Sequence, residues 1–516
     1  MTAYQWFVFF LIIQVVHFLG TWKLYESAGR KRWEAAIPVY NAIVLMKIIN
    51  RPTWWTVLLF IPIINLIMFP VIWVETLRSF GKRSSLDTFL GIITFGFYIY
   101  YVNYTQKLDY IADRSLHPEN KTGDTISSLL FAVIVATLVH TYFIQPYTIP
   151  TSSLEKSLLI GDFLFVSKMN YGARVPLTTV ALPMVHDSIP LTKSKSYLTW
   201  PQLPYMRLPG IQNINRTDIV VFNWPVDTVY RFFDTSKRRA YKPVDKKSNY
   251  VKRCVGIPGD SLSIKDGIVY INGKILQLPE RAKPQFSYAV ALDGKTSIDF
   301  ESLLKELDIT DDAGFKNDLR DTLFLKALTA AGAERLKNVP GVVSVTRQIS
   351  KGIEGGIFPH INKWNRDNFG PIYIPQKGKT VSLTPETFPF YRMIISEYEK
   401  KDLKVNGSEI RIDGKVVNSY TFDQNYYWMM GDNRHNSEDS RYWGYVPEDH
   451  IVGKPIFIWL SIDPHGKGLN KVRWNRVFTT VSGEGQPQSY FKLFLLALVA
   501  YFVGEYFWKK RKEKKD

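Results

Sequence analysis

The sequence contains very little cysteine. Its 516 residues include only one, Cys254. A single cysteine cannot form a disulfide within the chain, and it excludes zinc and iron–sulfur sites built from cysteine alone. The eight histidines are scattered, and none pairs with another at the spacing of metal ligands. The sequence therefore gives no sign of a metal site.

Several catalytic motifs are also missing. The sequence has no HExxH pair, no GxxxxGK[ST] phosphate-binding loop and no GxSxG nucleophile elbow. These absences exclude zincins, P-loop nucleotide hydrolases and enzymes with the α/β-hydrolase elbow. A Ser-His-Asp triad stays open, because His435 and His450 lie near a polar cluster at 429–447.

Acidic residues are too few to balance the basic ones. Asp and Glu number 47 against 65 Lys and Arg, and the net charge is +18. Such an excess points to nucleic acid, to anionic lipid or to the cytoplasmic flanks of membrane spans. The chain is also too long for one compact core, so we expect several modules.

Long apolar runs are present, and they are unevenly placed. A helix of roughly 20 mostly apolar residues can cross the hydrocarbon layer, and core helices rarely stay apolar on every side. We therefore predict four spans, in the runs 4–22, 54–75, 125–147 and 489–508. A fifth run, 88–104, is of marginal length.

Basic residues orient these runs. Six lie between residues 23 and 53, and KKRKEKKD follows the last run. The positive-inside rule makes both segments cytoplasmic, which places residues 148–488 outside. One conflict remains: if all five runs cross, Lys82 and Arg83 fall outside. Either the run 88–104 does not cross the membrane fully, or the loop with Lys82 and Arg83 is too short for the positive-inside rule to apply.

The exterior segment is predicted to be mainly β. Three hairpin turn pairs, Asp266-Gly267, Asn272-Gly273 and Asp413-Gly414, separate short β-type runs. An insertion at about 280–405 interrupts them and is predicted to be helical over 300–338. The expected domains are a membrane region (1–124), a span (125–147), the β module (148–488), a last span (489–508) and a basic tail (509–516).

Three polar segments stand out from this background. They are IPTSSLEKSLLIGD (149–162), YVKRCVGIPGD (250–260) and GDNRHNSEDSRYWG (431–444). Each alone is typical of an ordinary turn, strand or salt-bridged loop. Together they supply a hydroxyl, a lysine in an apolar strand and a dense polar loop, which suggests a serine nucleophile activated by lysine.

A lysine can act as a base near neutral pH only if its environment lowers its pKa. Free lysine titrates near ~10.4, and burial disfavours its charged form. Alternation places Tyr250, Lys252 and Cys254 on one face of the strand, with Val251 and Arg253 on the other. We expect burial to lower the pKa of Lys252, assisted by Arg253 and by the cluster at 434–441.

The three segments resemble the conserved boxes of bacterial type I signal peptidases, also called leader peptidases. The second and third boxes match almost throughout, and TDIVVFNWP (217–225) resembles the strand between them. In the first box Ser152 replaces a glycine, Leu154 replaces a methionine and Glu155-Lys156-Ser157 replaces a Pro-Thr segment. Residues 1–124 and the insertion lie outside the resemblance.

The resemblance implies a role for each matching residue. Ser153 is the nucleophile and Lys252 the general base. Thr151 and the Ser153 amide form the oxyanion hole, and Ser437 orients the lysine amine. Residues that brace the site are Asp432, Arg434, Asp439, Arg441 and Arg253. Residues that line a pocket for small substrate side chains are Ile149, Leu154, Leu158, Tyr250, Val251, Tyr147 and Leu164.

The resemblance also implies the function. We expect a serine endopeptidase with a signal-peptidase-like β fold, working without metal or cofactor, that removes signal peptides after Ala-x-Ala-type sequences. Its expected partners are precursor proteins and membrane lipids, near the export machinery, with no nucleic acid. We expect it in the cytoplasmic membrane as a multi-pass protein whose catalytic module faces the periplasm.

Two other classes of function remain open. An inactive membrane scaffold of the same fold is the main alternative, although intact Ser153, Lys252 and Ser437 disfavour it. A transporter or receptor would need ionisable residues within its spans, and His17 and His140 are the candidates.

Overall fold

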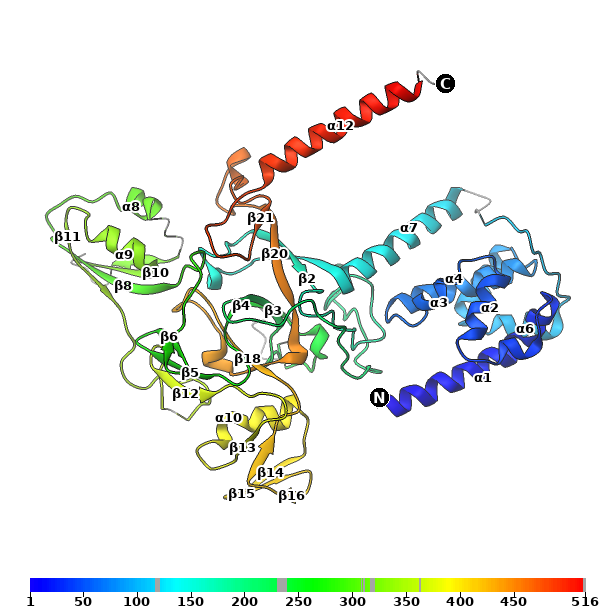
Figure 1. The fold of residues 1–516 in the computed structure, drawn as a ribbon, viewed down its shortest axis with the longest axis horizontal. Coiled ribbons are helices and arrows are strands. Elements are labelled where there is room, and N and C mark those ends of the chain that lie inside the picture. Colours follow the sequence, from blue (N-terminus) through cyan, green and yellow to red (C-terminus); the bar gives the residue numbers. More distant parts are fainter. Residues whose placement is uncertain are drawn as a thin grey trace. The chain divides into compact units, whose positions relative to one another are not determined.

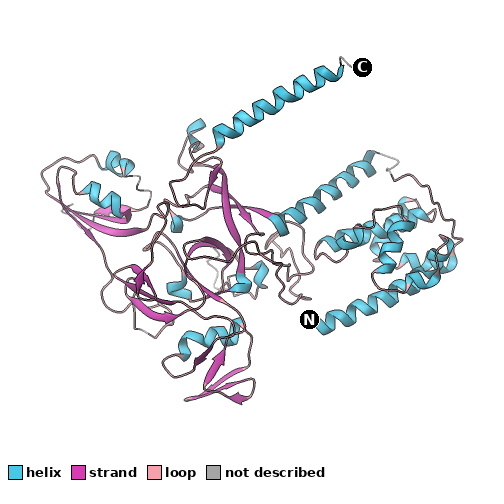
Figure 2. Cartoon of the chain, in the orientation of Figure 1, coloured by secondary structure: helices cyan, strands magenta, loops and turns pink. Residues whose placement is uncertain are grey.

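A computed structural model describes the chain except for residues 117–120, 230–238, 308, 310, 316–320, 362 and 514–516. The chain forms two compact units (Figures 1 and 2). Unit 1 comprises Met1–Phe143, Ala173–Leu208 and Arg239–Lys247. Unit 2 comprises Ile144–Gly172, Pro209–Arg238 and Ser248–Asp516.

Unit 1 is helical, and its longest helix matches the first apolar run. Its helices are α1 (Ala3–Ser27), α2 (Tyr40–Ile48), α3 (Trp55–Leu58), α4 (Ile64–Ser79), α5 (Ser85–Ile93), α6 (Tyr98–Thr105) and α7 (Lys121–Leu138), which continues as a π-helix, Val139–Phe143. A 3-10 helix, Arg32–Ala35, precedes α2. Among the described residues, three helices are long and apolar enough to cross a membrane: α1, α7 with its extension, and α12 (Phe491–Glu513) of unit 2.

The run 54–75 does not form the single helix that we predicted. It divides into α3 and α4, with a break between them. Pro62 lies in the break and has no N–H to donate to a helix, and Ile63 takes a left-handed conformation with φ of 71°. Helix α4 tolerates Pro70 and continues to Ser79. The marginal run 88–104 is also divided, into α5 and α6, which meet at 119°.

Unit 2 is largely β, as predicted. Its main sheet has eight antiparallel strands, in the order β1-β2-β20-β3-β4-β18-β19, with β21 paired to β20. The strands are β1 (Ile144–Thr148), β2 (Asp162–Ser167), β3 (Ile219–Asn223), β4 (Asn249–Gly256), β18 (Tyr426–Met430), β19 (Val446–Pro447), β20 (Ile451–Ser461) and β21 (Thr479–Thr480).

The long strand β20 joins the two halves of this sheet. Its first residues pair with β3, the rest of the strand pairs with β2, and the register shifts along both edges. Such bulges bend a sheet and increase its twist. Gly453 lies at the join, where an added Cβ would collide with the Ser167 backbone. The sheet therefore curls, and its middle strands bring distant segments of the chain together.

A second sheet confirms the predicted hairpin turns. Its order is β12-β5-β6-β7, and its strands are β5 (Ser261–Lys265), β6 (Ile268–Ile271), β7 (Lys274–Ile275) and β12 (Phe369–Tyr373). The turn pairs Asp266-Gly267 and Asn272-Gly273 have positive φ at both positions, as type I′ turns require. The pair Asp413-Gly414 also has positive φ at both positions, in the turn between β15 (Glu409–Ile412) and β16 (Lys415–Val416).

The smaller elements complete unit 2. Strands β13 (Thr380–Ser382) and β17 (Ser419–Thr421) form a pair, and β14 (Leu403–Asn406) extends the β15–β16 hairpin. The short helices are α10 (Phe388–Met393), which continues as a π-helix (Ile394–Tyr398), and α11 (Ser440–Trp443). Short 3-10 helices of unit 2 are Ser152–Leu154, Glu448–His450 and Gly468–Lys471, and Val244–Lys246 is a 3-10 helix of unit 1.

The insertion contains a sheet, so our prediction of a helical segment over 300–338 is wrong in its middle. The elements run β8 (Gln285–Leu292), α8 (Phe300–Glu306), β9 (Ala313–Phe315), β10 (Thr322–Thr329), α9 (Ala330–Leu336) and β11 (Val342–Arg347). The segment TLFLKALT forms β10 because it pairs with β8 along one edge and with β9 along the other. Tertiary pairing overrides its local helical preference.

The insertion has a recognisable topology. Its antiparallel sheet has the order β11-β8-β10-β9, which is the fourth, first, third and second strand of a βαββαβ unit. This is the split-βαβ, ferredoxin-like arrangement. Leu303 of α8 and Ala333 of α9 belong to one apolar cluster with Val290 and Leu325 of the sheet. The insertion thus has a core of its own, at the left of Figure 1.

Candidate active site

Ser153 and Lys252 meet in the middle of the main sheet. Lys252 lies on β4, between β3 and β18, and Ser153 lies in the 3-10 helix Ser152–Leu154 that follows β1. The Lys252 Nζ donates to the Ser153 Oγ at 2.5 Å. Both residues are buried, with 4% and 6% of their surfaces exposed. The structure therefore brings together the two residues that the sequence singled out, 99 positions apart.

Burial has the largest effect on the Lys252 amine. It lowers the pKa of Lys252 from 10.5 to about 8, because an ammonium group loses its hydration in a buried site. We expected the surrounding charges to lower the pKa as well, and this is only partly correct. Arg441 lowers it, but Asp439 and Glu438 raise it. Arg253 lies on the opposite face of the strand and pairs elsewhere.

The alternation predicted for β4 explains why Arg253 lies away from the Lys252 amine. Tyr250 and Lys252 share a face, and the Lys252 amine lies 5.5 Å from the centre of the Tyr250 ring. On the other face, Arg253 binds Asp432 through two hydrogen bonds of 2.8 and 2.6 Å. Ser157 Oγ donates to the same carboxylate at 2.6 Å. Burial opposes ionisation of Asp432, but the Arg253 charge, the hydrogen bonds from Arg253 and Ser157 and the Arg434 charge together outweigh it and lower the pKa of Asp432.

A second buried ion pair fixes the polar loop at 431–444. Arg441 donates to both carboxylate oxygens of Asp439 at 2.8 Å, and Asp439 also accepts from the Gly431 amide at 3.0 Å. Arg441 reaches the Arg434 carbonyl at 2.6 Å. Arg434 itself is buried, and this burial lowers the pKa of its guanidinium to about 10. All five residues proposed to brace the site thus lie in one charged cluster around Ser153 and Lys252.

Thr151 and Ser437 flank the Ser–Lys pair. Thr151 is exposed and immediately precedes the 3-10 helix. Ser437 is buried beside Gly431, and its hydroxyl has no hydrogen-bond partner among the described residues. Its bond to the lysine amine and the oxyanion role of Thr151 both stay predictions.

Six of the seven predicted pocket residues belong to one apolar cluster. Ile149, Leu154, Leu158 and Leu164 are its buried members, and Tyr147 and Val251 pack against it. The seventh, Tyr250, joins a neighbouring cluster, where its ring stacks on Trp224 with centroids 5.1 Å apart. The apolar cluster therefore begins directly beside Ser153, since Leu154 follows Ser153 in the chain.

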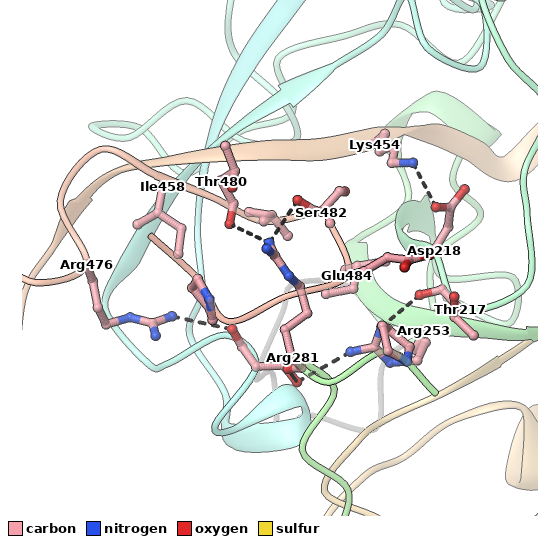
Figure 3. Close-up of a pocket in the computed structure, with 16 residues that line it drawn as sticks. Thr217, Asp218, Arg253, Arg281, Lys454, Ile458, Arg476, Thr480, Ser482 and Glu484 are labelled. Carbon is pink, nitrogen blue, oxygen red and sulfur yellow. Dashed lines mark hydrogen bonds and ion pairs between the residues drawn. The ribbon is translucent and has the colours of Figure 1, made fainter. Parts of the chain in front are cut away.

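A cavity of about 210 Å³ lies near the Arg253 face of β4 (Figure 3). Its walls include Ser157, Arg253, Arg281 and Lys454, and they include neither Ser153 nor Lys252. The cations along it already have partners: Lys454 binds Asp218 at 2.7 Å, and Arg281 donates to the Thr480 and Ser482 carbonyls. The cavity is thus separate from the reacting pair.

The histidine alternative loses support. Both ring nitrogens of His435 are occupied, one by Asp367 Oδ1 at 2.8 Å and the other by the Ser287 amide at 3.1 Å. His450 contacts Asp449. The Ser153 hydroxyl instead accepts a hydrogen bond from Lys252.

Several residues at the site escaped the sequence analysis. Asn433 and Asn436 bind the Ser152–Ser153 turn, Glu438 acts on the Lys252 amine, and Gln285 and Asp311 reach the site from the insertion. The two asparagines and Glu438 lie within the polar loop and could have been found there. No local pattern marks Gln285 or Asp311, because only the folded insertion places them near the site.

Gly431 gives a test of how closely the loop packs on Ser153. An added Cβ would lie 2.5 Å from the Ser153 carbonyl oxygen and would also overlap Ser437. We expect Gly431→Ala to shift the Ser152–Ser153 turn and to lower kcat by about tenfold or more, because overpacking of about 1–3 kcal/mol would act on the nucleophile.

The control for this variant is Gly355→Ala, because no atom lies within 4 Å of a Cβ added at Gly355. Peptidase kinetics on both purified proteins make the comparison. Equal activity of the two variants would show that the loop does not constrain the nucleophile.

Comparison with known proteins agrees with this geometry. The family described as "Signal peptidase, peptidase S26" matches residues 122–316 and 377–460, more than half of the chain. A family of unknown function (DUF5684) matches residues 33–113.

Individual relatives share the same description. Signal peptidase I of Buchnera aphidicola subsp. Acyrthosiphon pisum is 22% identical over 386 residues, which cover 72% of this chain and 90% of the relative. The Haemophilus influenzae enzyme is 24% identical over 377 residues, 71% of this chain and 78% of the relative. Signal peptidase I of Helicobacter pylori (strain J99) is 25% identical over 368 residues, 69% of this chain and 92% of the relative. The chain therefore belongs to the bacterial signal peptidase family, peptidase S26, and is a serine-protease hydrolase that cleaves signal peptides from precursor proteins.

Proposed function

We propose that the protein is a membrane-bound signal peptidase that cleaves after small residues by a Ser153–Lys252 dyad. The observation that carries this proposal is the 2.5 Å hydrogen bond between the Lys252 amine and the Ser153 hydroxyl in a buried site. It favours an active enzyme over an inactive scaffold of the same fold.

The proposed reaction begins with a neutral lysine. The Lys252 amine accepts the Ser153 proton as Oγ attacks the scissile carbonyl. The Ser153 amide and the Thr151 hydroxyl donate to the oxyanion that forms. The resulting ammonium group protonates the leaving amine, and the released amine is the new amino terminus of the mature protein. A water molecule then gives its proton to Lys252 as its oxygen attacks the acyl ester. The bond from the carbonyl carbon to Ser153 Oγ breaks, Oγ takes the proton back from Lys252, and the signal peptide leaves with a free carboxylate.

The apolar cluster beside Ser153 supports the preference for small residues. Leu154, Leu158 and Leu164 are at most 1% exposed, so their side chains fill the space under the nucleophile. We expect the substrate side chain to meet this packed cluster in a shallow recess with Ile149 and Val251 at its wall. A small side chain fits such a recess, and a large one would have to displace packed core residues.

The membrane arrangement can be argued from the contacts within unit 1. The indole of Trp6, at the amino end of α1, donates to the Gln202 carbonyl at 2.9 Å. At the carboxyl end of α1, Ser27 donates to the Leu108 carbonyl. Since α1 has 25 residues, its ends lie roughly 37 Å apart. Gln202 and Leu108 therefore belong to opposite sides of the bilayer, and we assign the side of Gln202 to the exterior.

The two divided runs enter and return on one side. Arg51, before α3, binds Glu75, near the end of α4, at 2.8 Å, and Arg114 binds the same carboxylate. Lys82, before α5, donates to Gln106, after α6, at 3.1 Å. Each pair of helices thus begins and ends at the same surface. Lys82 and Arg83 then stay cytoplasmic, which removes the conflict with the positive-inside rule.

This arrangement leaves three crossings: α1, α7 with its extension, and α12. The chain enters the cytoplasm after α1, leaves it through α7 and returns through α12 to the basic tail. The peptidase module lies between α7 and α12 and faces the periplasm, where the cleavage sites of translocated precursors emerge. Contacts with membrane lipids and a position near the export machinery follow from that location.

The nucleophile assignment is tested by two adjacent serines. We expect Ser153→Ala to abolish cleavage of an Ala-x-Ala peptide, with a loss of roughly 10⁴-fold or more in kcat. Ser152→Ala should leave much of the activity, because it removes only the hydrogen bond from Asn436, while Asn433 still donates to the Ser152 and Ser153 carbonyls and the Ser153–Lys252 hydrogen bond is kept. If Ser152→Ala is the inactive variant, the register of the nucleophile is wrong by one residue.

The base assignment is tested by pH. Cleavage should rise as the pH increases through about 8, because the ammonium form of Lys252 cannot accept the serine proton and the neutral form prevails above its pKa. Lys252→Arg should be inactive, since a guanidinium stays protonated. Lys265→Arg, on the exposed end of β5, is the matched control. An active Lys252→Arg enzyme would exclude lysine as the base.

The membrane arrangement is tested by cysteine labelling. Cys254→Ala removes the one native thiol, and single cysteines are then placed at Ser85 and Ser194, which are both exposed. A membrane-impermeant maleimide should label position 194 in intact spheroplasts. It should label position 85 only after the membrane is permeabilised. Labelling of position 85 in intact spheroplasts would contradict the return of α3 and α4 to the cytoplasmic surface.

A further inference from the structure

The inserted βαββαβ module is hydrogen-bonded to the polar loop 431–444. Gln285, at the start of β8, donates its amide to the Asp432 carbonyl at 2.8 Å and accepts the Arg434 amide at 2.9 Å. Its side chain donates to the Glu155 carbonyl at 2.8 Å. The module is thus joined by main-chain hydrogen bonds to the loop and by a side chain to the segment that follows Ser153.

A second contact comes from the segment between α8 and β9. The Asp311 carboxylate accepts the side-chain amide of Asn433 at 2.6 Å on one oxygen. It accepts that of Asn436 at 3.1 Å on the other. The two amides therefore converge on one carboxylate, and hydrogen bonds to an ionised acceptor are stronger than those between neutral groups.

Both asparagines also hold the turn that carries the nucleophile. The Asn433 side chain donates to the Ser152 carbonyl at 3.2 Å, and its backbone amide donates to the Ser153 carbonyl at 3.1 Å. The Asn436 side chain donates to the Ser152 hydroxyl at 2.9 Å. A continuous chain of hydrogen bonds thus runs from Asp311 to the residue bearing the attacking oxygen.

The turn needs such external support. The 3-10 helix has only three residues, Ser152–Leu154, and so short a helix makes few hydrogen bonds of its own. Catalysis requires the Ser153 Oγ to stay within reach of both the lysine amine and the scissile carbonyl, and a small displacement lowers the rate steeply. The carboxylate of Asp311 fixes the direction of the two amides that hold this turn.

We propose that Asp311 is a positioning residue, supplied by the inserted module, that holds Ser153 in its attacking position through Asn433 and Asn436. This proposal rests on the Ser153–Lys252 dyad of the proposed function. Asp311 contacts neither Ser153 nor Lys252 in the hydrogen bonds described, so it acts on catalysis through the turn.

This role predicts a specific kinetic pattern. The substrate recess is formed by the cluster around Leu154 and Leu164, which Asp311 does not join, so the KM for a peptide should change by less than about threefold. Because a hydrogen bond to a charged group is worth on the order of tenfold or more, kcat should fall about 10- to 100-fold. The apparent pKa of the rate profile should not move, because the Asp311 carboxylate binds Asn433 and Asn436 and not the Lys252 amine.

The experiment compares Asp311→Asn with Asp312→Asn in the full-length, detergent-solubilised protein. The control is matched because Asp312 is the next residue and its carboxylate is 90% exposed in an ion pair with Lys326. Asparagine keeps the size of the side chain but loses the charge, and its own amide group would face a donor. We expect the drop in kcat for Asp311→Asn alone, with KM, the pH profile and the melting temperature of the module unchanged.

Two further measurements complete the test. In a double-mutant cycle with Asn436→Ala, the losses in kcat should not multiply, because both changes interrupt the same connection. Asp311→Glu keeps the carboxylate and should recover part of the activity. Equal kcat for Asp311→Asn and Asp312→Asn would overturn the proposal, as would a loss expressed in KM or in the melting temperature alone.

Failure of this proposal can be distinguished from failure of the proposed function. If Ser153→Ala is inactive while Asp311→Asn behaves like its control, the dyad stands and the positioning role falls. If Ser153→Ala keeps its activity, the dyad itself is wrong, and the positioning role falls with it.

Discussion

The loss of water from one lysine amine governs the chemistry of this protein. Lys252 lies on a central strand with its amine against the Ser153 hydroxyl, and burial brings its pKa down to about 8. An exposed lysine would hold its proton at neutral pH and could not accept another. The site therefore depends on a sheet that surrounds Lys252 on both sides and on a short turn that covers it with the nucleophile.

The charges around the Lys252 amine must not raise its pKa back to the value of an exposed lysine. Arg253 and Arg441 are each committed to one carboxylate, Asp432 and Asp439, through paired hydrogen bonds. Breaking such a buried pair would leave an uncompensated charge at considerable cost. Pairing also limits the pull of the carboxylates on Lys252. The alternation of β4 contributes, because it turns Arg253 away from the face that carries the amine.

Much of the site could be predicted from the sequence, and the parts that could not share a physical cause. The three polar boxes and the hairpin turns depend on local patterns, so Ser153, Lys252 and the Asp-Gly turns were identifiable, whereas the pocket residues followed only from the family resemblance. The sequence alone does not distinguish Pro62, which lies in the break of 54–75, from Pro70, which α4 accommodates. The strand at 322–329 exists because β8 and β9 pair with it. Asp311 lies in a segment without any motif, and only the folding of the insertion carries it to Asn433 and Asn436. Sequence reasoning also expected the whole cluster at 434–441 to lower the pKa of Lys252, whereas Asp439 raises it, because no spacing in the sequence reveals how close each charge lies to the amine.

The protonation of Lys252 can be observed directly. Both the wild-type protein and Lys252→Ala would be labelled with ¹⁵N-lysine. The amine resonance that is missing from the spectrum of Lys252→Ala belongs to Lys252, and its chemical shift could then be followed against pH. Half-protonation near pH 8 in the wild-type protein is the predicted result. An amine that stays protonated up to the ordinary lysine value of 10.5 would contradict the central claim, because Ser153 would then have no base beside it.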